Sequence, residues 1–349
     1  MRMAGVSIGS ADNLLVRVEA DNGLLGWGEA ASAPTMTGDL QAGMVAAVRE
    51  ILAPALIGED ALEHARLGRS CAGLLAGNHG AKSAVEMALL DLAGRHLEVP
   101  VSDLLGGALR RRVRPMLLLG NERVDDDIAE ARANSEQGVG FFKLKLGVKP
   151  LDEEIAATRA LRAALGEATT ICADANMGYT VEQAERYAAA VAECGLLFLE
   201  QPVRDADIEG MARVAASGAI PLCADEPIAG AEDIRRFHAA GAARGVNLKT
   251  IKFGGPSATV RAGHLCEALG LSVNLACKVA ESSIGAAALA HVGAAIARLD
   301  WGVSVTHRYL ADDLVIEPLE IRNGEVEVPT GPGLGVEIDE RRIERYRVR

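Results

Sequence analysis

The chain has 349 residues, a hydrophobic content of 49% and a formal net charge of −12 at pH 7. This length fits a barrel of roughly 200 residues or more together with an accessory domain. The acidic balance argues against nucleic-acid binding, because phosphate recognition needs a basic face. No uncharged apolar run reaches the roughly 18 residues of a membrane span, and the first residues contain no signal-peptide core, so we expect a cytoplasmic protein without a membrane partner.

The N-terminal third predicts an α+β unit. Apolar segments flank an Asp-Asn-Gly turn at 21–23, which indicates a β-hairpin within residues 1–30. Residues 31–38 are small and polar with Pro and Gly, so we expect a mobile loop there. Apolar periodicity then predicts three helices, at 40–56, 62–75 and 81–96.

Short apolar runs alternate with helix-like stretches from Val113 onward, after a Gly-rich and Arg-rich linker at 104–115. We predict strands at 113–119, 140–146, 170–175, 196–201, 220–225, 245–251, 272–278 and about 300–305. This alternation is typical of a parallel sheet, either an open doubly wound sheet or a barrel. An open sheet would be expected to place a nucleotide-binding loop after its first strand, and none follows residue 119, so we favour the barrel.

Six cysteines show no Cys-x-x-Cys pairing. Cys172, Cys223 and Cys277 fall in the predicted buried strands. We interpret the six as reduced core thiols of a cytosolic protein.

Charged side chains recur at the predicted strand ends with spacings of 24 to 29 residues, namely Lys145, Asp174, Glu200, Asp225 and Lys249. This spacing equals one strand-plus-helix unit, and in a parallel barrel such ends meet at one mouth. The strand period of two points these side chains inward, over a layer made of Lys143, Cys172, Phe198, Cys223 and Asn247. Buried charge is costly unless it is paired or metal-bound, so the ring indicates a site. The plain alternative is a lysine–carboxylate network that only holds the barrel together.

Asp174, Glu200 and Asp225 offer hard oxygen ligands, which favour Mg²⁺, with Mn²⁺ as a substitute. Zinc would prefer His or Cys, and the seven histidines lie away from the strand ends. A cation held there could bind a substrate carboxylate and stabilise its enediolate when the neighbouring C–H bond is deprotonated.

Three lysines flank the acids. A lysine acts as a base only when burial and nearby positive charge lower its pKa, and Lys143 beside Lys145, with the metal close, would provide both. Lys249 lies on the opposite side of the ring, so we expect it to act on the other face of the same carbon.

These residues resemble the mandelate racemase/muconate lactonizing enzyme family of the enolase superfamily, over nearly the whole chain. GLLGWGEA resembles its capping-domain strand, DLLGG its linker and GPGLGVEID its C-terminal return, while the Lys-x-Lys motif resembles the muconate lactonizing subgroup. The resemblance implies an α/β fold, a modified TIM (β/α)7β barrel with an α+β capping domain. We place the capping domain at 1–110, the barrel at 111–308, and a segment returning to the capping domain at 309–349.

The resemblance also implies roles for the ring. The three acids would bind the metal, Lys145 and Lys249 would form an acid/base pair, and Lys143 would assist Lys145 and steer the substrate carboxylate.

The pattern departs from that of known members where substrate specificity is set. Ser304 stands where cycloisomerases of the subgroup carry Glu, and the Asp-x-Asp of dipeptide epimerases is absent there. Betaine epimerases use a Trp nearby, but we expect Trp301 to serve packing. Lys278 and Glu281 follow the seventh strand as polar candidates for substrate contact. We expect further substrate contacts from Met36, Thr37 and Asn176.

We therefore predict Mg²⁺-dependent abstraction of the α-proton of a small carboxylate. Racemisation, epimerisation, dehydration and cycloisomerisation all begin with the same enediolate. Our first expectation is a racemase, epimerase or dehydratase of an amino-acid-like acid, including the hydroxyproline type, and the second is a muconate-type cycloisomerase. A rival from another class is a non-catalytic carboxylate-binding barrel. We expect a homo-oligomer, a dimer or octamer.

Overall fold

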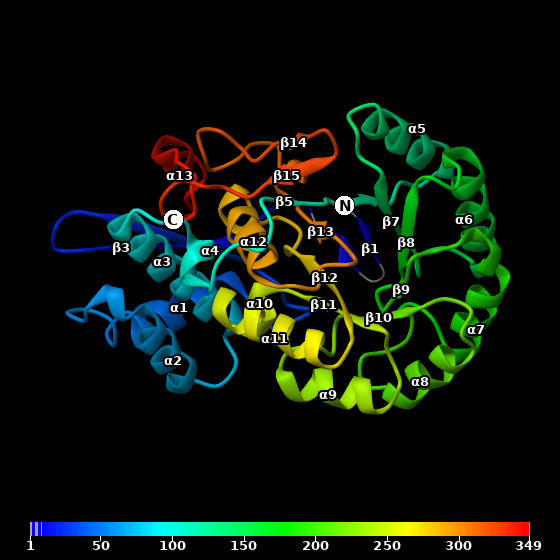
Figure 1. The fold of residues 1–349 in the computed structure, drawn as a ribbon, viewed down its shortest axis with the longest axis horizontal. Coiled ribbons are helices and arrows are strands. Elements are labelled where there is room, and N and C mark those ends of the chain that lie inside the picture. The colour runs from blue at the N-terminus through cyan, green and yellow to red at the C-terminus, as the bar shows by residue number, and fades with distance from the viewer. Residues whose placement is uncertain (1, 4–5, 8, 349) are drawn as a thin grey trace.

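The computed structural model describes residues 2–3, 6–7 and 9–348. It consists of a parallel barrel ringed by helices and a smaller α+β capping domain beside it, joined by the C-terminal segment (Figure 1). This is the TIM-like α/β architecture predicted from the sequence.

Eight parallel strands form the barrel and pair in sequence order. They are β6 (Leu117–Leu119), β7 (Phe141–Lys145), β8 (Thr170–Asp174), β9 (Leu199–Glu200), β10 (Leu222–Ala224), β11 (Gly245–Leu248), β12 (Ser272–Ala276) and β13 (Val303–Ser304). The ring closes where the Val303 N–H donates to the Arg114 carbonyl at 2.9 Å and the Met116 N–H donates to the Val303 carbonyl at 2.8 Å. All eight predicted strands are present.

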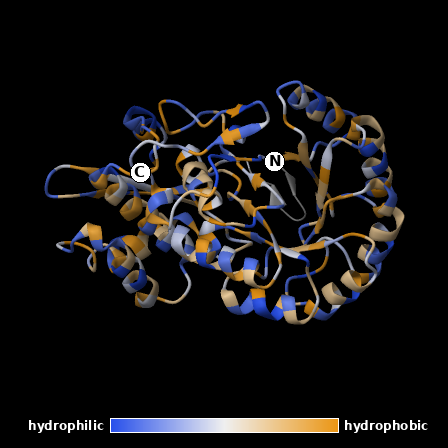
Figure 2. Ribbon diagram, in the orientation of Figure 1, coloured by the Kyte–Doolittle hydropathy of each residue, from blue (hydrophilic) through white to orange (hydrophobic). Residues whose placement is uncertain are grey.

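One longer helix joins each pair of consecutive strands, which gives the (β/α)7β order. These helices are α5 (Val124–Ser135), α6 (Leu151–Leu165), α7 (Val181–Ala190), α8 (Ile208–Ala216), α9 (Ala231–Ala239), α11 (Pro256–Ala268) and α12 (Ser283–Ala295). The short α10 (Thr250–Phe253) precedes α11. Figure 2 shows polar and apolar faces alternating around the outer helices, as expected for helices packed on a sheet. Every residue of α12 is buried, because this helix also contacts the capping domain.

The observed strands are shorter than predicted, and two of the differences have an identifiable cause. Residues 113–119 do not form one strand, because Pro115 lacks an N–H and interrupts the ladder. The short β5 (Arg112–Val113) instead pairs with β15 of the C-terminal segment. The strand predicted over 245–251 ends at Leu248, because Thr250 already begins α10.

The capping domain holds the predicted hairpin, with β3 antiparallel to β4. Its elements are β3 (Asn13–Glu19), β4 (Leu25–Ala31), α1 (Gln41–Ala47), a π-helical turn at Val48–Leu52, α2 (His64–Leu74), α3 (His79–Leu97) and α4 (Val101–Leu104). Before it, β1 (Arg2–Met3) pairs with β2 (Val6–Ser7). The C-terminal segment adds β14 (Ile321–Arg322), β15 (Glu325–Glu327) and α13 (Glu340–Tyr346).

Two further expectations concern the whole chain. The six cysteines are all buried and form no disulfide. Among the described residues, no helix combines the length and the apolar character needed to cross a membrane.

The hairpin contacts α3 at backbone distance, and two glycines make this contact possible. A Cβ placed on Gly28 would lie 1.9 Å from the Ala84 carbonyl oxygen, and one placed on Gly26 would lie 2.2 Å from the Ala88 carbonyl oxygen. Neither obstacle can move without shifting α3. This packing fixes the direction in which β4 leads into the loop that covers the barrel mouth.

We predict that Gly28→Ala lowers the free energy of unfolding by about 2–3 kcal/mol or more, because the new methyl group must displace α3. Gly43→Ala is the matched control. Gly43 lies in α1 with no atom within 4 Å of its would-be Cβ, so this change should stabilise the chain by about 0.5–1 kcal/mol through helix propensity. Chemical denaturation of the two variants provides the measurement. Equal effects would contradict the close packing of hairpin and helix.

Candidate active site

The ends of consecutive strands bring the predicted charges together at the barrel mouth. Lys145 is the direct partner of Asp174 across β7 and β8, and Asp174 is the partner of Glu200 across β8 and β9. Across β9 and β10, Glu200 pairs with Cys223, so Asp225 follows two residues further along. The three acids therefore come from adjacent strands, and Lys249 follows on β11. All five side chains line one pocket, together with Lys143.

Each acid faces at least one ammonium group. The Lys145 Nζ lies 2.6 Å from the Asp174 Oδ2, and the Lys143 Nζ lies 2.5 Å from the Glu200 Oε2. The other oxygens are also engaged. The Asp174 Oδ1 accepts the backbone N–H of Asn176 at 2.9 Å, and the Glu200 Oε1 accepts from the Asn247 side chain at 2.7 Å. The paired side chains are only 1–8% exposed, and the pairing explains how the barrel tolerates so much buried charge.

Asp225 is held by two lysines. Its Oδ2 lies 2.5 Å from the Lys249 Nζ, and its Oδ1 lies 2.7 Å from the Lys252 Nζ. Burial alone would raise the pKa of Asp225, but the charges of Lys249 and Lys252 outweigh it and hold the pKa well below its usual range. The sequence reasoning missed Lys252. Its signal was the Lys-x-x-Lys spacing, since the start of α10 places residues three apart on one side.

The carboxylates of the ring set the pKa values of two of its lysines. Burial works to lower the pKa of Lys143, but the charges of Glu200 and Asp174 outweigh it and raise the pKa. The pKa of Lys249 is likewise raised, because the charge of Asp225 outweighs burial. The sequence-based expectation rested on burial, on the neighbouring lysine and on a bound cation. The carboxylates lie closer, and they decide the direction.

Two carboxyl groups in the pocket are destabilised as anions. Burial, and then the charge of Asp174, raises the pKa of Glu200. Burial, and then the charge of Asp225, raises the pKa of Glu226 to about 8. Glu226 was not among the predicted site residues, although it directly follows Asp225. Its Oε1 accepts from the Asn176 side chain at 3.1 Å, so Asn176 contacts both Asp174 and Glu226.

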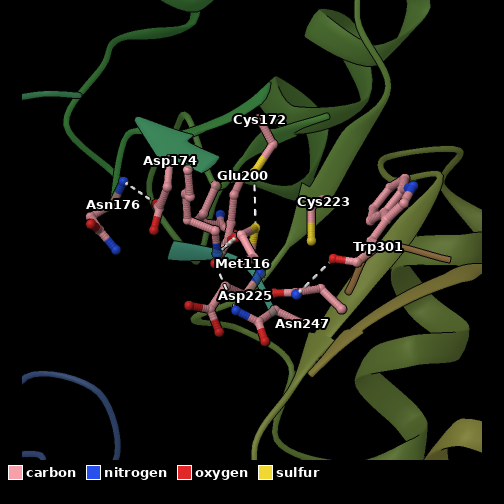
Figure 3. A network of polar contacts seen from close by, with 12 residues as sticks. Met116, Cys172, Asp174, Asn176, Glu200, Cys223, Asp225, Asn247 and Trp301 are labelled. Atoms are coloured by element: carbon pink, nitrogen blue, oxygen red, sulfur yellow. Dashed lines mark hydrogen bonds and ion pairs between the residues drawn. The ribbon is translucent and has the colours of Figure 1, made fainter. Parts of the chain in front are cut away.

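An apolar floor lies below the charged ring. Cys172, Phe198, Cys223 and Trp301 cluster inside the barrel, and the rings of Phe198 and Trp301 stack at 4.5 Å. Figure 3 shows the acids grouped on one side of this network and Cys223 and Trp301 on the other. Trp301 is 5% exposed and does not line the pocket, so its role is packing, as expected.

The loop after β4 reaches the pocket. Met36 lines it, with its Sδ 3.8 Å from the Lys249 Nζ, and Thr35 lines it as well. Thr37 does not line the pocket, because its hydroxyl turns back to the Asp39 carboxylate at 2.9 Å. The structure thus places Thr35 where the sequence suggested Thr37.

The half of the mouth opposite the acids is built by β12 and β13. Lys278 and Ser304 line the pocket there. Glu281 does not line it; its Oε2 accepts the backbone N–H of Lys278 at 2.9 Å. Burial, and then the charge of Glu29, raises the pKa of Glu281 to about 8.

Comparison with known proteins assigns the family. A family model described as the mandelate racemase/muconate lactonizing enzyme N-terminal domain matches residues 1–106, and one described as enolase C-terminal domain-like matches residues 126–342. The chain belongs to the mandelate racemase/muconate lactonizing enzyme family. Its relatives place it in the muconate lactonizing enzyme-like subgroup of the enolase superfamily, as the resemblance implied.

Two curated relatives illustrate the likeness. Muconate cycloisomerase 1 of Pseudomonas putida is 34% identical over 339 residues, which cover 95% of this chain and 90% of the relative. A chloromuconate cycloisomerase of Cupriavidus pinatubonensis is 31% identical over 338 residues, covering 96% and 91%. Members of this subgroup are isomerases of the enolase superfamily, so the chain is an enzyme of that superfamily.

Solved structures agree with the fold. The muconate lactonizing enzyme from Pseudomonas putida matches with a TM-score of 0.92 at 33% identity, covering 96% of this chain and 94% of that one. The muconate lactonizing enzyme from Pseudomonas fluorescens in complex with muconolactone matches with a TM-score of 0.93 at 31% identity, covering 96% and 91%.

Members of this family are generally dependent on a divalent metal. The question for this pocket is whether its side chains could hold such an ion. Within the described residues, no three Asp, Glu, His or Cys side chains already surround one metal-sized point, because the acid oxygens face lysines. The donor set nevertheless fits Mg²⁺. It consists of hard carboxylate oxygens on three adjacent strands, and the charge of Asp174 raises the pKa of Glu200, a repulsion that a cation would relieve. Asp174, Glu200 and Asp225 are the residues that would hold it.

We predict that Asp225→Asn weakens Mg²⁺ binding at least tenfold, because a charged hard ligand is lost while the side chain keeps its shape. Calorimetric titration of EDTA-treated protein with Mg²⁺ measures this. Asp127→Asn is the matched control, since Asp127 is a buried acid of α5 that does not line this pocket. Unchanged Mg²⁺ affinity in a correctly folded Asp225→Asn variant would rule out Asp225 as a ligand.

We also predict a pH effect on stability from Glu281. Its pKa in the folded chain, about 8, lies above the ordinary value of 4.5, so its stabilising contribution is complete below pH 4.5 and is lost as the pH rises through 8. Between these values the slope approaches about 1.4 kcal/mol per pH unit. Glu281→Gln should remove this slope. Unfolding free energies at pH 5 to 9 test it, with the exposed Glu153→Gln as control, and identical slopes in wild type and Glu281→Gln would contradict it.

Proposed function

We propose that this enzyme interconverts a small carboxylate substrate and its enediolate by moving one proton at the α-carbon. One observation carries the proposal. Lys145 on β7 and Lys249 after β11 flank the three acids of β8, β9 and β10, so an α-carbon in the pocket has an ammonium group on each side. A barrel that only bound carboxylates would have no use for acids buried at this cost.

The residues divide the work. Asp174, Glu200 and Asp225 would hold Mg²⁺, or Mn²⁺ as a substitute, which would supply positive charge for the enediolate and lower the pKa of the neighbouring lysines. Lys143, buried behind Lys145, would place positive charge beside the substrate carboxylate. Lys145 and Lys249 hold or accept the α-proton, and Met36 helps to exclude water from above.

Cycloisomerisation of a muconate-type diacid is the outcome that the relatives support best. The racemase or dehydratase reading preferred from the sequence has less support, because the similar curated proteins bear muconate or chloromuconate cycloisomerase names. In this reaction one carboxylate oxygen of the substrate adds to the far double bond, at the carbon β to the other carboxylate. The π electrons shift into the other carboxylate as an enediolate, and a lysine ammonium delivers a proton to its α-carbon. That lysine regains its proton from water.

Proton exchange without lactonisation is the second candidate, and Ser304 favours it. Cycloisomerases of the subgroup are expected to carry Glu at this place, whereas the Ser304 hydroxyl is buried without a hydrogen-bond partner among the described residues. A racemase, epimerase or dehydratase acting on an amino-acid-like acid, including the hydroxyproline type, needs only the two lysines and the metal.

One experiment separates the two candidates. The Mg²⁺-loaded enzyme is incubated in D₂O with cis,cis-muconate and, separately, with a library of amino acids and hydroxy acids, and the products are followed by NMR. Lactone carrying one deuterium at the α-carbon supports cycloisomerisation. Deuterium exchange in a library member without lactone formation supports the second candidate. If no compound gives either result, the enediolate proposal is contradicted.

We predict that Lys145→Ala and Lys249→Ala each reduce turnover of the substrate found in this way. Removal of the lysine that transfers the proton should lower kcat by about 10²–10⁴-fold. In a racemase, each variant should still exchange the α-proton of one enantiomer with solvent deuterium. In a cycloisomerase, one lysine should be indispensable and the other should act mainly through its charge. Lys149→Ala, outside this pocket, is the control. Near-wild-type turnover in both single variants would show that the two-lysine mechanism is wrong.

A further inference from the structure

Lys278 is a buried cation that forms no ion pair with the described residues. Its side chain lines the pocket and the residue is only 8% exposed. Within the described part of the chain, no carboxylate lies within ion-pair distance of its ammonium, and its Nζ donates no hydrogen bond to protein. An isolated buried ammonium is costly, so this arrangement needs a reason.

The other lysines of the mouth show the contrast. Lys143, Lys145, Lys249 and Lys252 each lie within 2.7 Å of a carboxylate oxygen. Lys278 faces two of these ammonium groups, and burial together with the charge of Lys249 lowers its pKa to about 8. The protein thus keeps a positive group in a place that already repels it.

The charge of Glu281 acts on Lys278, but its carboxyl group forms no ion pair with the ammonium. Its Oε2 is occupied by the backbone N–H of Lys278, at 2.9 Å, and its Oε1 is buried without a partner among the described residues. The carboxyl group therefore shapes the turn that carries Lys278 and leaves the ammonium free to face the pocket.

The backbone around Lys278 is held on several sides. The Thr306 hydroxyl donates to the Lys278 carbonyl at 2.8 Å, and the Cys277 N–H donates to the Ser304 carbonyl at 2.9 Å. Ala280 has a φ of +91°, a conformation that a non-glycine residue adopts only when its surroundings impose it. A fixed backbone that carries an ammonium without a protein partner is typical of a group that binds a ligand.

The position of Lys278 indicates which part of a ligand it meets. In the barrel order, β12 and β13 lie opposite β8, β9 and β10, which carry the acids. Ala276 and Ser304 are direct partners across β12 and β13, so Ser304 lies beside the start of the Lys278 turn. A substrate whose reacting carboxylate binds on the acid side therefore extends its other end towards Lys278 and Ser304.

We propose that Lys278 and Ser304 form a second anion-binding subsite, which recognises a carboxylate at the end of the substrate remote from the reacting carbon. The Lys278 ammonium and the unpartnered Ser304 hydroxyl are its donors. This inference rests on the proposed function for the identity of the first subsite. It selects diacids, and it disfavours substrates with a free ammonium group at that end, because Lys278 would repel them.

Binding, not turnover, tests the subsite, so that its failure is separable from that of the proposed reaction. The Mg²⁺-loaded full chain is titrated calorimetrically with succinate, glutarate and adipate, and with the monoacids of equal length, butyrate, pentanoate and hexanoate. In the wild type, at least one diacid should bind roughly tenfold or more tightly than its monoacid, as expected for a charge-assisted hydrogen bond.

Three variants sharpen the test. Lys278→Met removes the charge at similar size and should bring the best diacid to within about twofold of its monoacid. Ser304→Ala should reduce the preference partly. Lys149→Met removes the same charge outside the pocket and should leave the preference unchanged. Circular dichroism confirms that each variant is folded.

The outcomes are distinct. Absence of any diacid preference in the wild type, or its survival in Lys278→Met, would overturn the subsite even if proton exchange at the α-carbon is observed. A preference that depends on Lys278 in a protein without exchange activity would leave the subsite standing while the proposed reaction fails.

Discussion

Compensation of buried charge is the constraint on which the barrel mouth depends. Asp174, Glu200 and Asp225 lie at or just after the ends of adjacent strands, so their mutual repulsion cannot be relieved by moving one of them outward. Lysines from the flanking strands supply the balancing charge at 2.5 to 2.7 Å. The same pairs that stabilise the fold thus bring proton donors into contact with the metal-binding candidates, which links stability and chemistry in one network.

The positions of these side chains follow from repetition in the barrel. The β/α units from β7 to β11 each contribute a charged residue at or just after the end of the strand, so a single register error would turn that residue towards the helices. Below them, the stacked Phe198 and Trp301 fill the barrel and keep water from the charged ring. The floor is therefore part of the electrostatics, because it maintains the low dielectric that makes each pair strong.

Much of this arrangement could be predicted from the sequence. Strand-end spacing placed Lys145, Asp174 and Glu200 correctly because that spacing is a property of the chain itself. Where a side-chain hydrogen bond or a local helical turn sets the direction of a side chain, the sequence did not predict that direction. Thr37 turns away towards Asp39, and Lys252 enters through a helical turn that interrupts a predicted strand. The pKa values of Lys143 and Lys249 depend on distances between side chains of different strands, which the sequence alone does not give.

Glu29 connects the two segments that enclose a substrate. Its buried carboxylate accepts hydrogen bonds from Asn13 in the hairpin and from Ser282 and Gly285 at the start of α12. The loop that carries Met36 begins a few residues after Glu29, and the turn that carries Lys278 ends beside Ser282. Both walls of the pocket are therefore anchored close to one carboxylate. An evolutionary change of substrate that repositions one wall must be accommodated by the other, so the capping domain and the seventh β/α unit are expected to vary as a matched pair.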